Sequence, residues 1–224
     1  MSWAVKEKLL DENPCKNVKF LLEEEKKREL LNPQEINMLF GPEWEKYWGK
    51  YHYYIMNKLA ACTGMRIGEV VGLKGMFVSN VHVFVNGQYS KYGYTDTKNH
   101  KEREIPIIDK VIEELGVLKQ VNGDGYLFST DGGKTPVSKK AVSNSLSRAL
   151  EMAGISNAEQ KERGLSFHSW RHFFNTTMLL EDIPRVMVEA LTGLSSAALT
   201  RRYTKIKRSH LRDITGVQEK MISG

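Results

Sequence analysis

Cysteine is scarce in this 224-residue chain, and long apolar runs are missing from it. The two cysteines, Cys15 and Cys62, are far apart and do not form a pair with the spacing of a metal site or a redox motif. No segment approaches the ~20 uninterrupted apolar residues of a membrane span, and the first residues lack an apolar secretory region. These absences exclude a disulfide-stapled secreted domain and a membrane protein, so we expect a soluble chain in the reducing cytoplasm.

Several common catalytic motifs are also missing. The run 132–135 (Gly-Gly-Lys-Thr) ends like a phosphate-binding loop, but Phe128 stands where that loop needs a glycine, and Pro136 disrupts the helix start that should follow. His168 and His172 have the spacing of a zinc pair without the glutamate that would serve as a base between them. No carboxylate cluster resembles a two-metal nuclease site. We therefore expect chemistry that uses neither a metal nor a small-molecule cofactor.

Positive charge is in excess. The formal net charge is +6 and the isoelectric point is about 9.1, which suits a polyanionic partner. Residues 200–212 contain six basic side chains and no acidic one. A run of this kind is typical either of a solvated face or of a nucleic-acid contact.

Hydrophobic spacing predicts a mainly α (α+β) domain. Asn32, Pro33 and Glu35 form a helix start, and an apolar stripe at spacings of three and four predicts one long helix over 43–62. Alternating residues predict an antiparallel sheet of about three strands over 81–107, with a hairpin turn at Asn86-Gly87. Further helices are expected over 111–118, 138–153, 167–180 and 185–191, and from about residue 195 past Tyr203.

Two arginines have neighbours that suit phosphate chemistry. Gly64 allows the chain to turn out of the preceding helix, so that Arg66 starts the next helix with Glu69 three residues on to orient it. Arg171 shares a helix face with His168 by the same spacing. Guanidinium groups fixed in advance fit the charge that develops on a phosphate under attack.

Four blocks of the sequence resemble the tyrosine recombinase family of phage-type integrases and chromosome-resolving recombinases. They occur in the order and spacing of that family, from about residue 30 to the end, and comprise residues 61–73, 97–106, 167–172 and 199–204. The resemblance implies that the catalytic residues are Arg66, Lys98, His168, Arg171 and Tyr203, with Glu69 as the orienting acid. We expect three basic residues beside the tyrosine, Arg201, Arg202 and Lys205, to bind DNA.

The resemblance also implies a mechanism and partners. Tyr203 would attack a DNA phosphate, form a 3′-phosphotyrosyl link and release a 5′-hydroxyl, while Lys98 donates a proton to the departing oxygen. The partners would be double-stranded DNA and further copies of the chain, in a tetramer assembled on DNA through residues 205–224. Residues 1–27 would be a linker or the remnant of an amino-terminal core-binding domain, and residues 28–224 the catalytic domain.

One position departs from the family pattern. Nine residues before Tyr203 the family usually has a histidine or tryptophan, but this chain has Leu194, which donates no side-chain hydrogen bond. Either the site works with one donor fewer, at a cost of roughly 10² to 10³ in rate, or another side chain substitutes, or the enzyme is degenerate.

Two rival functions follow from the same residues. A type IB topoisomerase uses a similar tyrosine and similar cations, but its second block usually has lysine where this chain has His168. A non-catalytic DNA-binding module is favoured only by Leu194. Plasmid relaxation without recombinant products indicates the first rival, and DNA binding without a covalent adduct indicates the second.

Overall fold

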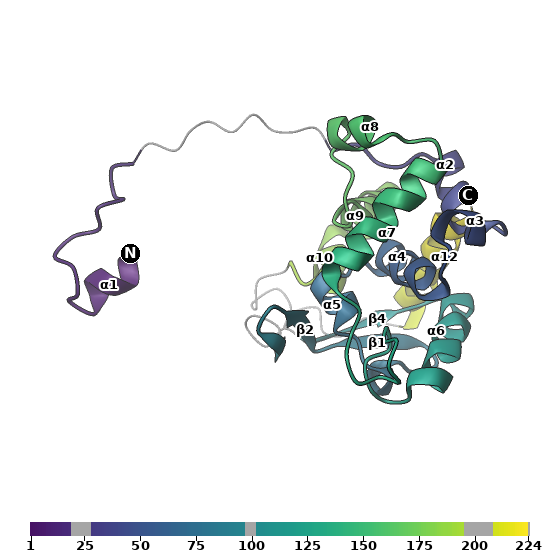
Figure 1. Cartoon of the computed structure of the whole chain (residues 1–224), viewed down its shortest axis with the longest axis horizontal. Helices are drawn as coiled ribbons and strands as arrows, with labels where there is room; N and C mark the ends of the chain where they lie inside the picture. The colour runs from purple at the N-terminus through teal and green to yellow at the C-terminus, as the bar shows by residue number, and fades with distance from the viewer. Residues whose placement is uncertain (19–27, 97–101, 195–207, 224) are drawn as a thin grey trace.

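The domain is built around one buried helix, α4 (Tyr51–Thr63). The computed structural model describes residues 1–18, 28–96, 102–194 and 208–223, and in it every residue from Tyr54 to Thr63 is buried. A helix that is buried on all sides belongs at the centre of a domain. Helices α3, α5, α6, α7, α9 and α12 all contact α4, and Figure 1 shows it enclosed by them.

Other helical segments surround this centre. They are α2 (Pro33–Phe40), α3 (Trp44–Trp48), α5 (Ile67–Val71), the 3₁₀ turn η1 (Gly75–Phe77), α6 (Asp109–Asn122), α7 (Lys139–Met152), α8 (Asn157–Glu162), α9 (Ser169–Leu180), α10 (Arg185–Thr192) and α12 (Arg208–Ser223). Helix α1 (Ser2–Lys6) buries none of its residues and does not belong to this packing. The predicted start of α2 is confirmed, because the Asn32 side chain and Glu35 form a reciprocal capping box. The helix expected from about residue 195 past Tyr203 falls largely on 195–207, outside the described residues.

The prediction of one continuous helix over 43–62 is wrong. Gly49 adopts a left-handed conformation with φ +65° and ends α3, and α4 starts again at Tyr51. The apolar stripe still packs inward as predicted, since Trp48 stacks on Phe40 and the ring of Tyr54 stacks on Trp44. The periodicity therefore identified the buried face correctly but did not show the break.

The sheet also differs from the prediction. Instead of one sheet of three strands, the described residues form two antiparallel ladders, in which β1 (His82–Val85) pairs with β4 (Arg103–Pro106) and β2 (Gly87–Ser90) pairs with β3 (Gly93–Asp96). Asn86-Gly87 is not a hairpin turn, because it connects β1 to β2, which belong to different ladders. A Cβ at Gly87 would lie 2.4 Å from the Tyr94 hydroxyl, so a larger residue there would displace this ring. The predicted class, a mainly helical domain with small antiparallel sheets, is confirmed.

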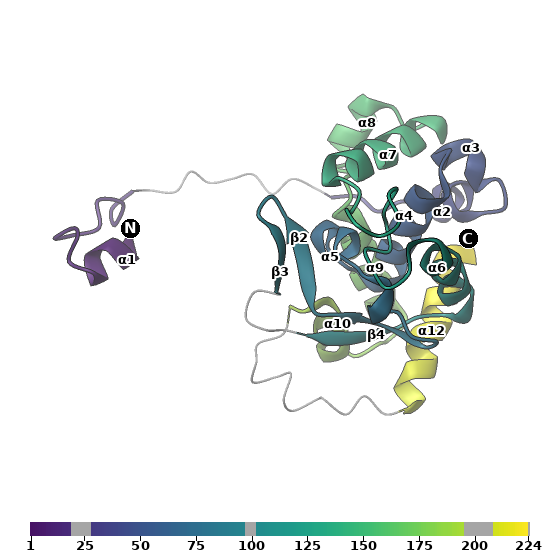
Figure 2. The ribbon, with the colours of Figure 1, turned by 60° about the horizontal axis from the view of Figure 1, so that its bottom comes forward.

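The last helix, α12, packs on the same chain. Its apolar face buries Ile214, Val217, Met221 and Ile222 against the domain, and Figure 2 shows the helix, in yellow, beside β4. The side chain of Gln218, which is fully buried, donates to the carbonyls of Cys62 (2.9 Å) and Pro106 (2.7 Å) and accepts from the amide of Ile108 (3.1 Å). These three bonds fix the register of α12 on the core. None of the described helices combines the length and the apolar character needed to cross a membrane.

We expect Gln218→Ala to lower the free energy of unfolding by about 1 to 3 kcal/mol, because it leaves buried backbone groups of three residues without their partner. Urea unfolding measures this. The exposed Asp213 lies on the same helix, so Asp213→Ala serves as the control, with an expected change within about 0.5 kcal/mol. Equal effects of the two changes would contradict the fixing role of Gln218.

Candidate active site

Arg66 is positioned by the turn that leaves the central helix. Gly64 ends α4 with φ +62°, and a Cβ there would lie 2.8 Å from Cδ1 of Phe174 and 2.9 Å from Cγ2 of Thr192. Only glycine fits this turn, for both its conformation and its packing. Arg66 then stands at the N-cap of α5 with its side chain 41% exposed, while Glu69 accepts from its amide at 2.8 Å and from its Nη1 at 3.0 Å. The geometry expected for these three residues is confirmed.

Arg171 lies beneath the same turn. It is 4% exposed, and its Nη1 donates to the carbonyl of Gly64 at 2.9 Å while Nη2 donates to that of Thr192 at 2.5 Å. Burial, followed by the positive charge of Arg66, lowers the pKa of Arg171 to about 10, so the group remains charged at neutral pH. These bonds use two of the five guanidinium N–H donors. The turn after α4 thus joins both predicted arginines.

Two histidines stand at the start of α9. His168 is the N-cap residue, it is open to solvent on part of its surface, and its ring meets that of His172 edge-on at 5.1 Å. Nη1 of Arg28 lies 2.7 Å from Nε2 of His172, which must accept because arginine only donates. Partial burial lowers the pKa of His168, and the charges of His172, Arg171, Arg28 and Arg66 lower it further. Near neutral pH His168 is therefore an uncharged imidazole beside several cations.

Glu69 balances part of this charge from a buried position. Nη2 of Arg103 lies 2.7 Å from Oε2 of Glu69 and Nη1 lies 3.3 Å from Oε1, so this carboxylate is shared between Arg103 and Arg66. Burial alone would raise the pKa of Glu69, but the charge and hydrogen bonds of Arg103, together with Arg66, bring it below its ordinary value. Glu69 is therefore ionised at neutral pH.

The elements that carry these groups meet on one side of the domain. Both α9 and β4 contact α10, and Figure 2 shows α5 beside them. The structure thus brings together Arg66, Glu69, His168 and Arg171, and it adds Arg28 and Arg103, which the sequence did not single out as site residues. The remaining predicted residues lie outside the described residues; they are Lys98, Arg201, Arg202, Tyr203 and Lys205.

Leu194 is the last described residue before the predicted nucleophile segment. Its amide donates to the carbonyl of Glu189 at 2.9 Å, and its side chain is 55% exposed. Gly193 before it ends α10 with φ +68°. An exposed leucine here supplies packing surface and no donor, so the departure noted in the sequence persists in the structure.

A helical domain that holds oriented guanidinium and imidazole groups around one turn forms a site suited to phosphate. The chain belongs to the phage integrase family, whose model matches residues 29–210. Among curated relatives, tyrosine recombinase XerD of Chlorobaculum tepidum is 29% identical over 161 residues, covering 68% of this chain and 48% of the relative. XerD of Staphylococcus aureus is 28% identical over 220 residues, covering 94% and 69%. The chain spans about half the length of the first curated relatives it matches.

Solved structures share the fold. The integrase of mycobacterium phage Brujita superposes with a TM-score of 0.63 at 18% identity, covering 98% of this chain and 67% of that one. The Tn1549 transposon integrase in complex with a circular intermediate DNA gives 0.65 at 17% identity, covering 94% and 73%. A lambda integrase tetramer bound to a Holliday junction gives 0.56 at 19% identity, covering 92% and 57%. The likeness supports the helical integrase fold.

We expect Glu69→Gln to cost about 3 kcal/mol of unfolding free energy at pH 7, because it leaves buried guanidinium charge without its partner. A carboxyl whose folded pKa is lowered stabilises the fold above its ordinary pKa of 4.5, and this stabilisation is lost as the pH falls through the folded value. The deficit of the variant should therefore narrow below about pH 4.5 in urea unfolding series.

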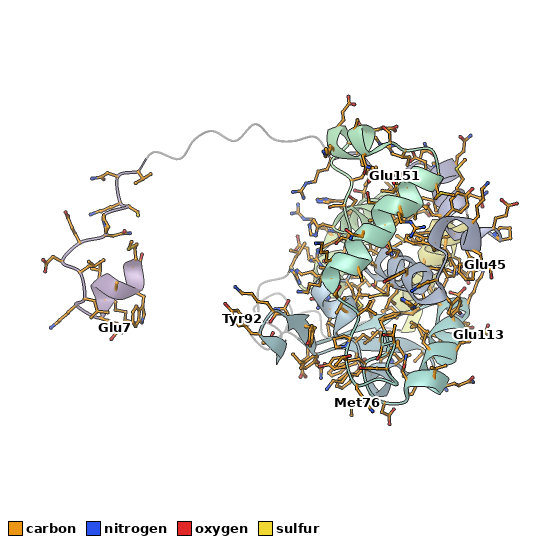
Figure 3. All side chains as sticks on the ribbon, in the orientation of Figure 1. Glu7, Glu45, Met76, Tyr92, Glu113 and Glu151 are labelled. Carbon is orange, nitrogen blue, oxygen red and sulfur yellow. The ribbon has the colours of Figure 1, made fainter. Side chains whose placement is uncertain are left out.

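The control for this pH series is Glu45→Gln, at an exposed position labelled in Figure 3. It removes one surface carboxylate and should leave stability at pH 7 within about 0.5 kcal/mol of the parent. A Glu69→Gln deficit that stays constant from pH 7 to pH 3 would rule out the ionised pairing.

Proposed function

We propose that this chain is the catalytic domain of a site-specific recombinase that cleaves and rejoins double-stranded DNA through a covalent 3′-phosphotyrosyl intermediate. The observation that carries the proposal is the joining of Arg66 and Arg171 at the turn after α4, with His168 beside them. Membership of the phage integrase family and relatives named as tyrosine recombinases support it. The reaction needs no ATP, because the phosphotyrosyl ester conserves the energy of the cleaved bond. It needs no metal, because Arg66 and Arg171 supply the positive charge that stabilises the attacked phosphate.

The arginines stabilise the phosphate as it is attacked. Arg66 is part-exposed and held by Glu69, and Arg171 is fixed by two carbonyls with N–H donors to spare. Donors fixed before the reaction need no reorganisation as charge grows on the non-bridging oxygens. We assign charge stabilisation to Arg66 and Arg171, assisted by His168, and orientation of Arg66 to Glu69.

Proton transfers complete the reaction. The hydroxyl oxygen of Tyr203 bonds to phosphorus, its proton passes to His168, and the bond from phosphorus to the 5′ oxygen breaks as Lys98 protonates that oxygen. Partial burial and neighbouring cations lower the pKa of His168 and keep it in the neutral form that accepts a proton. A 5′-hydroxyl of a second duplex reverses these steps and joins the strands.

We further propose the partners and the division of the chain. The basic residues Arg201, Arg202 and Lys205 contact DNA phosphates, and four copies assemble on DNA through residues 205–224; lambda integrase likewise forms a tetramer on a Holliday junction. Because α12 packs its apolar face on its own domain, this assembly uses the outer face of α12 or exchanges the segment between copies. Residues 28–224 form the catalytic domain, and residues 1–27 are a linker or the remnant of a core-binding domain. A DNA substrate implies work in the cytoplasm, at the nucleoid.

Tyr203→Phe should abolish covalent adduct formation on a suicide duplex, in which a nick near the cleavage site lets the freed 5′ strand diffuse away. Denaturing gels of protein mixed with labelled duplex measure the adduct. The control is Tyr92→Phe, since Tyr92 is 81% exposed and is labelled in Figure 3; it should retain full adduct formation. An undiminished adduct in Tyr203→Phe would refute the nucleophile, and no adduct with the unmodified chain would favour the binding module.

DNA binding should be weak and strongly dependent on salt, because phosphate contacts dominate it. Replacing Arg202 by Ala should reduce the slope of log K against log salt concentration by about one, as expected for one lost phosphate contact. Lys46→Ala, at an exposed position on α3, is the control and should leave the slope unchanged. Fluorescence anisotropy over a salt series measures both. Nanomolar, sequence-selective binding at physiological salt would contradict binding that phosphate contacts dominate.

A further inference from the structure

Arg103 joins three elements of the site without facing solvent. Its side chain is 8% exposed at the start of β4. Both Nη atoms contact Glu69 of α5, and Nε donates to the carbonyl of Leu191 in α10 at 2.6 Å. This planar fork holds both oxygens of a carboxylate and a carbonyl in one fixed geometry, whereas an ammonium group is a compact point charge that lacks the fork.

Through Glu69, Arg103 acts on Arg66. Oε1 of the shared carboxylate lies 3.0 Å from Nη1 of Arg66 and 3.3 Å from Nη1 of Arg103, and Oε2 lies 2.8 Å from the amide of Arg66 and 2.7 Å from Nη2 of Arg103. Each oxygen thus serves both residues. Without Arg103 the carboxylate would be free to turn toward Arg66 alone and change where that guanidinium points.

Arg103 also fixes the carboxyl end of α10. The carbonyls of Leu191 and Thr192, adjacent in the chain, accept from Arg103 and Arg171 respectively. Such terminal carbonyls have no partner within the helix and attract cations. A Cβ at Gly193 would lie 3.2 Å from Nη1 of Arg103, so this glycine leaves room for the guanidinium. The chain leaves α10 directly against Arg103, ten residues before Tyr203.

We propose that Arg103 is a positioning residue. It fixes the orientation of Arg66 relative to the end of α10, from which the chain continues toward Tyr203. The inference rests on the proposed function and goes beyond it. Arg103 does not touch the substrate, because it is buried and its fork is occupied by Glu69 and Leu191. It acts through Glu69 on the guanidinium of Arg66 and through the carbonyl of Leu191 on the end of α10.

The test compares Arg103→Met and Arg103→Lys with the unmodified chain at saturating suicide duplex. We expect adduct formation to fall about 10²-fold in the methionine variant and less in the lysine variant, which retains the charge without the fork. DNA affinity should stay within about twofold, because no phosphate contact is lost. If the methionine variant does not fold, the lysine variant alone is decisive.

A second substrate separates positioning from general damage to the fold. In a duplex whose scissile phosphate is replaced by a methylphosphonate, one charged oxygen is absent, so the reaction needs less guanidinium charge. The deficit of Arg66→Ala should shrink on this substrate, and the deficit of the Arg103 variants should shrink with it. A fold that is merely weakened would lose activity on both substrates in the same proportion.

Arg163 provides the matched control. It is 12% exposed, pairs with both oxygens of Glu35 at 2.7 and 2.9 Å, and donates to the carbonyl of Leu30 at 3.1 Å. Arg163→Met therefore removes the same kind of fork and should lower thermal stability without a preference between substrates. Equal behaviour of the Arg103 and Arg163 variants would overturn the positioning role alone. Failure of the unmodified chain to form any adduct would instead refute the proposed function, and the positioning role with it.

Discussion

The site depends on holding several positive charges close together in a largely buried setting. Arg66, Arg103 and Arg171 lie near enough to affect one another, and the mutual repulsion must be offset within the fold. One carboxylate, that of Glu69, offsets part of it. Backbone carbonyls at the ends of two helices offset a further part of the repulsion; they belong to Gly64 after α4 and to Leu191 and Thr192 in α10. The negative ends of both helix dipoles thus point at the arginines.

Among the described residues, the site retains a net positive charge, because its arginines outnumber its one carboxylate. This excess suits the proposed reaction. Arg66 is part-exposed, and His168 is kept neutral by partial burial and by the cations around it. A DNA phosphate would supply the missing negative charge, and further charge would develop on its oxygens during attack. Because the donors are already fixed by carbonyls and by Glu69, the phosphate would enter a site that needs little rearrangement.

Local sequence predicted the parts of the fold that local forces decide. The capping box of α2 and the unit formed by Gly64, Arg66 and Glu69 each span only a few residues, and both are as predicted. The break at Gly49 and the exchange of strand partners at Gly87 were missed, because an apolar period tolerates a single glycine and a ladder is decided by distant partners. Catalytic roles inferred from the family resemblance remain predictions.

Arg103 was missed for a related reason. Its partners Glu69 and Leu191 lie 34 and 88 positions away, so no spacing rule links them. The burial of Arg171 was equally invisible, since it depends on carbonyls that α4 and α10 present only once they are packed. Long-range pairing of a charged side chain with backbone groups leaves no periodic trace in a sequence.

Gly64 and Gly193 have a consequence that reaches beyond backbone geometry. Both take left-handed conformations at helix ends, and at both an added methyl group would crowd its surroundings, with Arg103 the neighbour at Gly193. Two positions without any functional group thus govern where the charged groups stand. A screen of random substitutions for loss of activity would therefore identify Gly64 and Gly193 together with the arginines, although neither glycine has a side chain that could take part in the reaction.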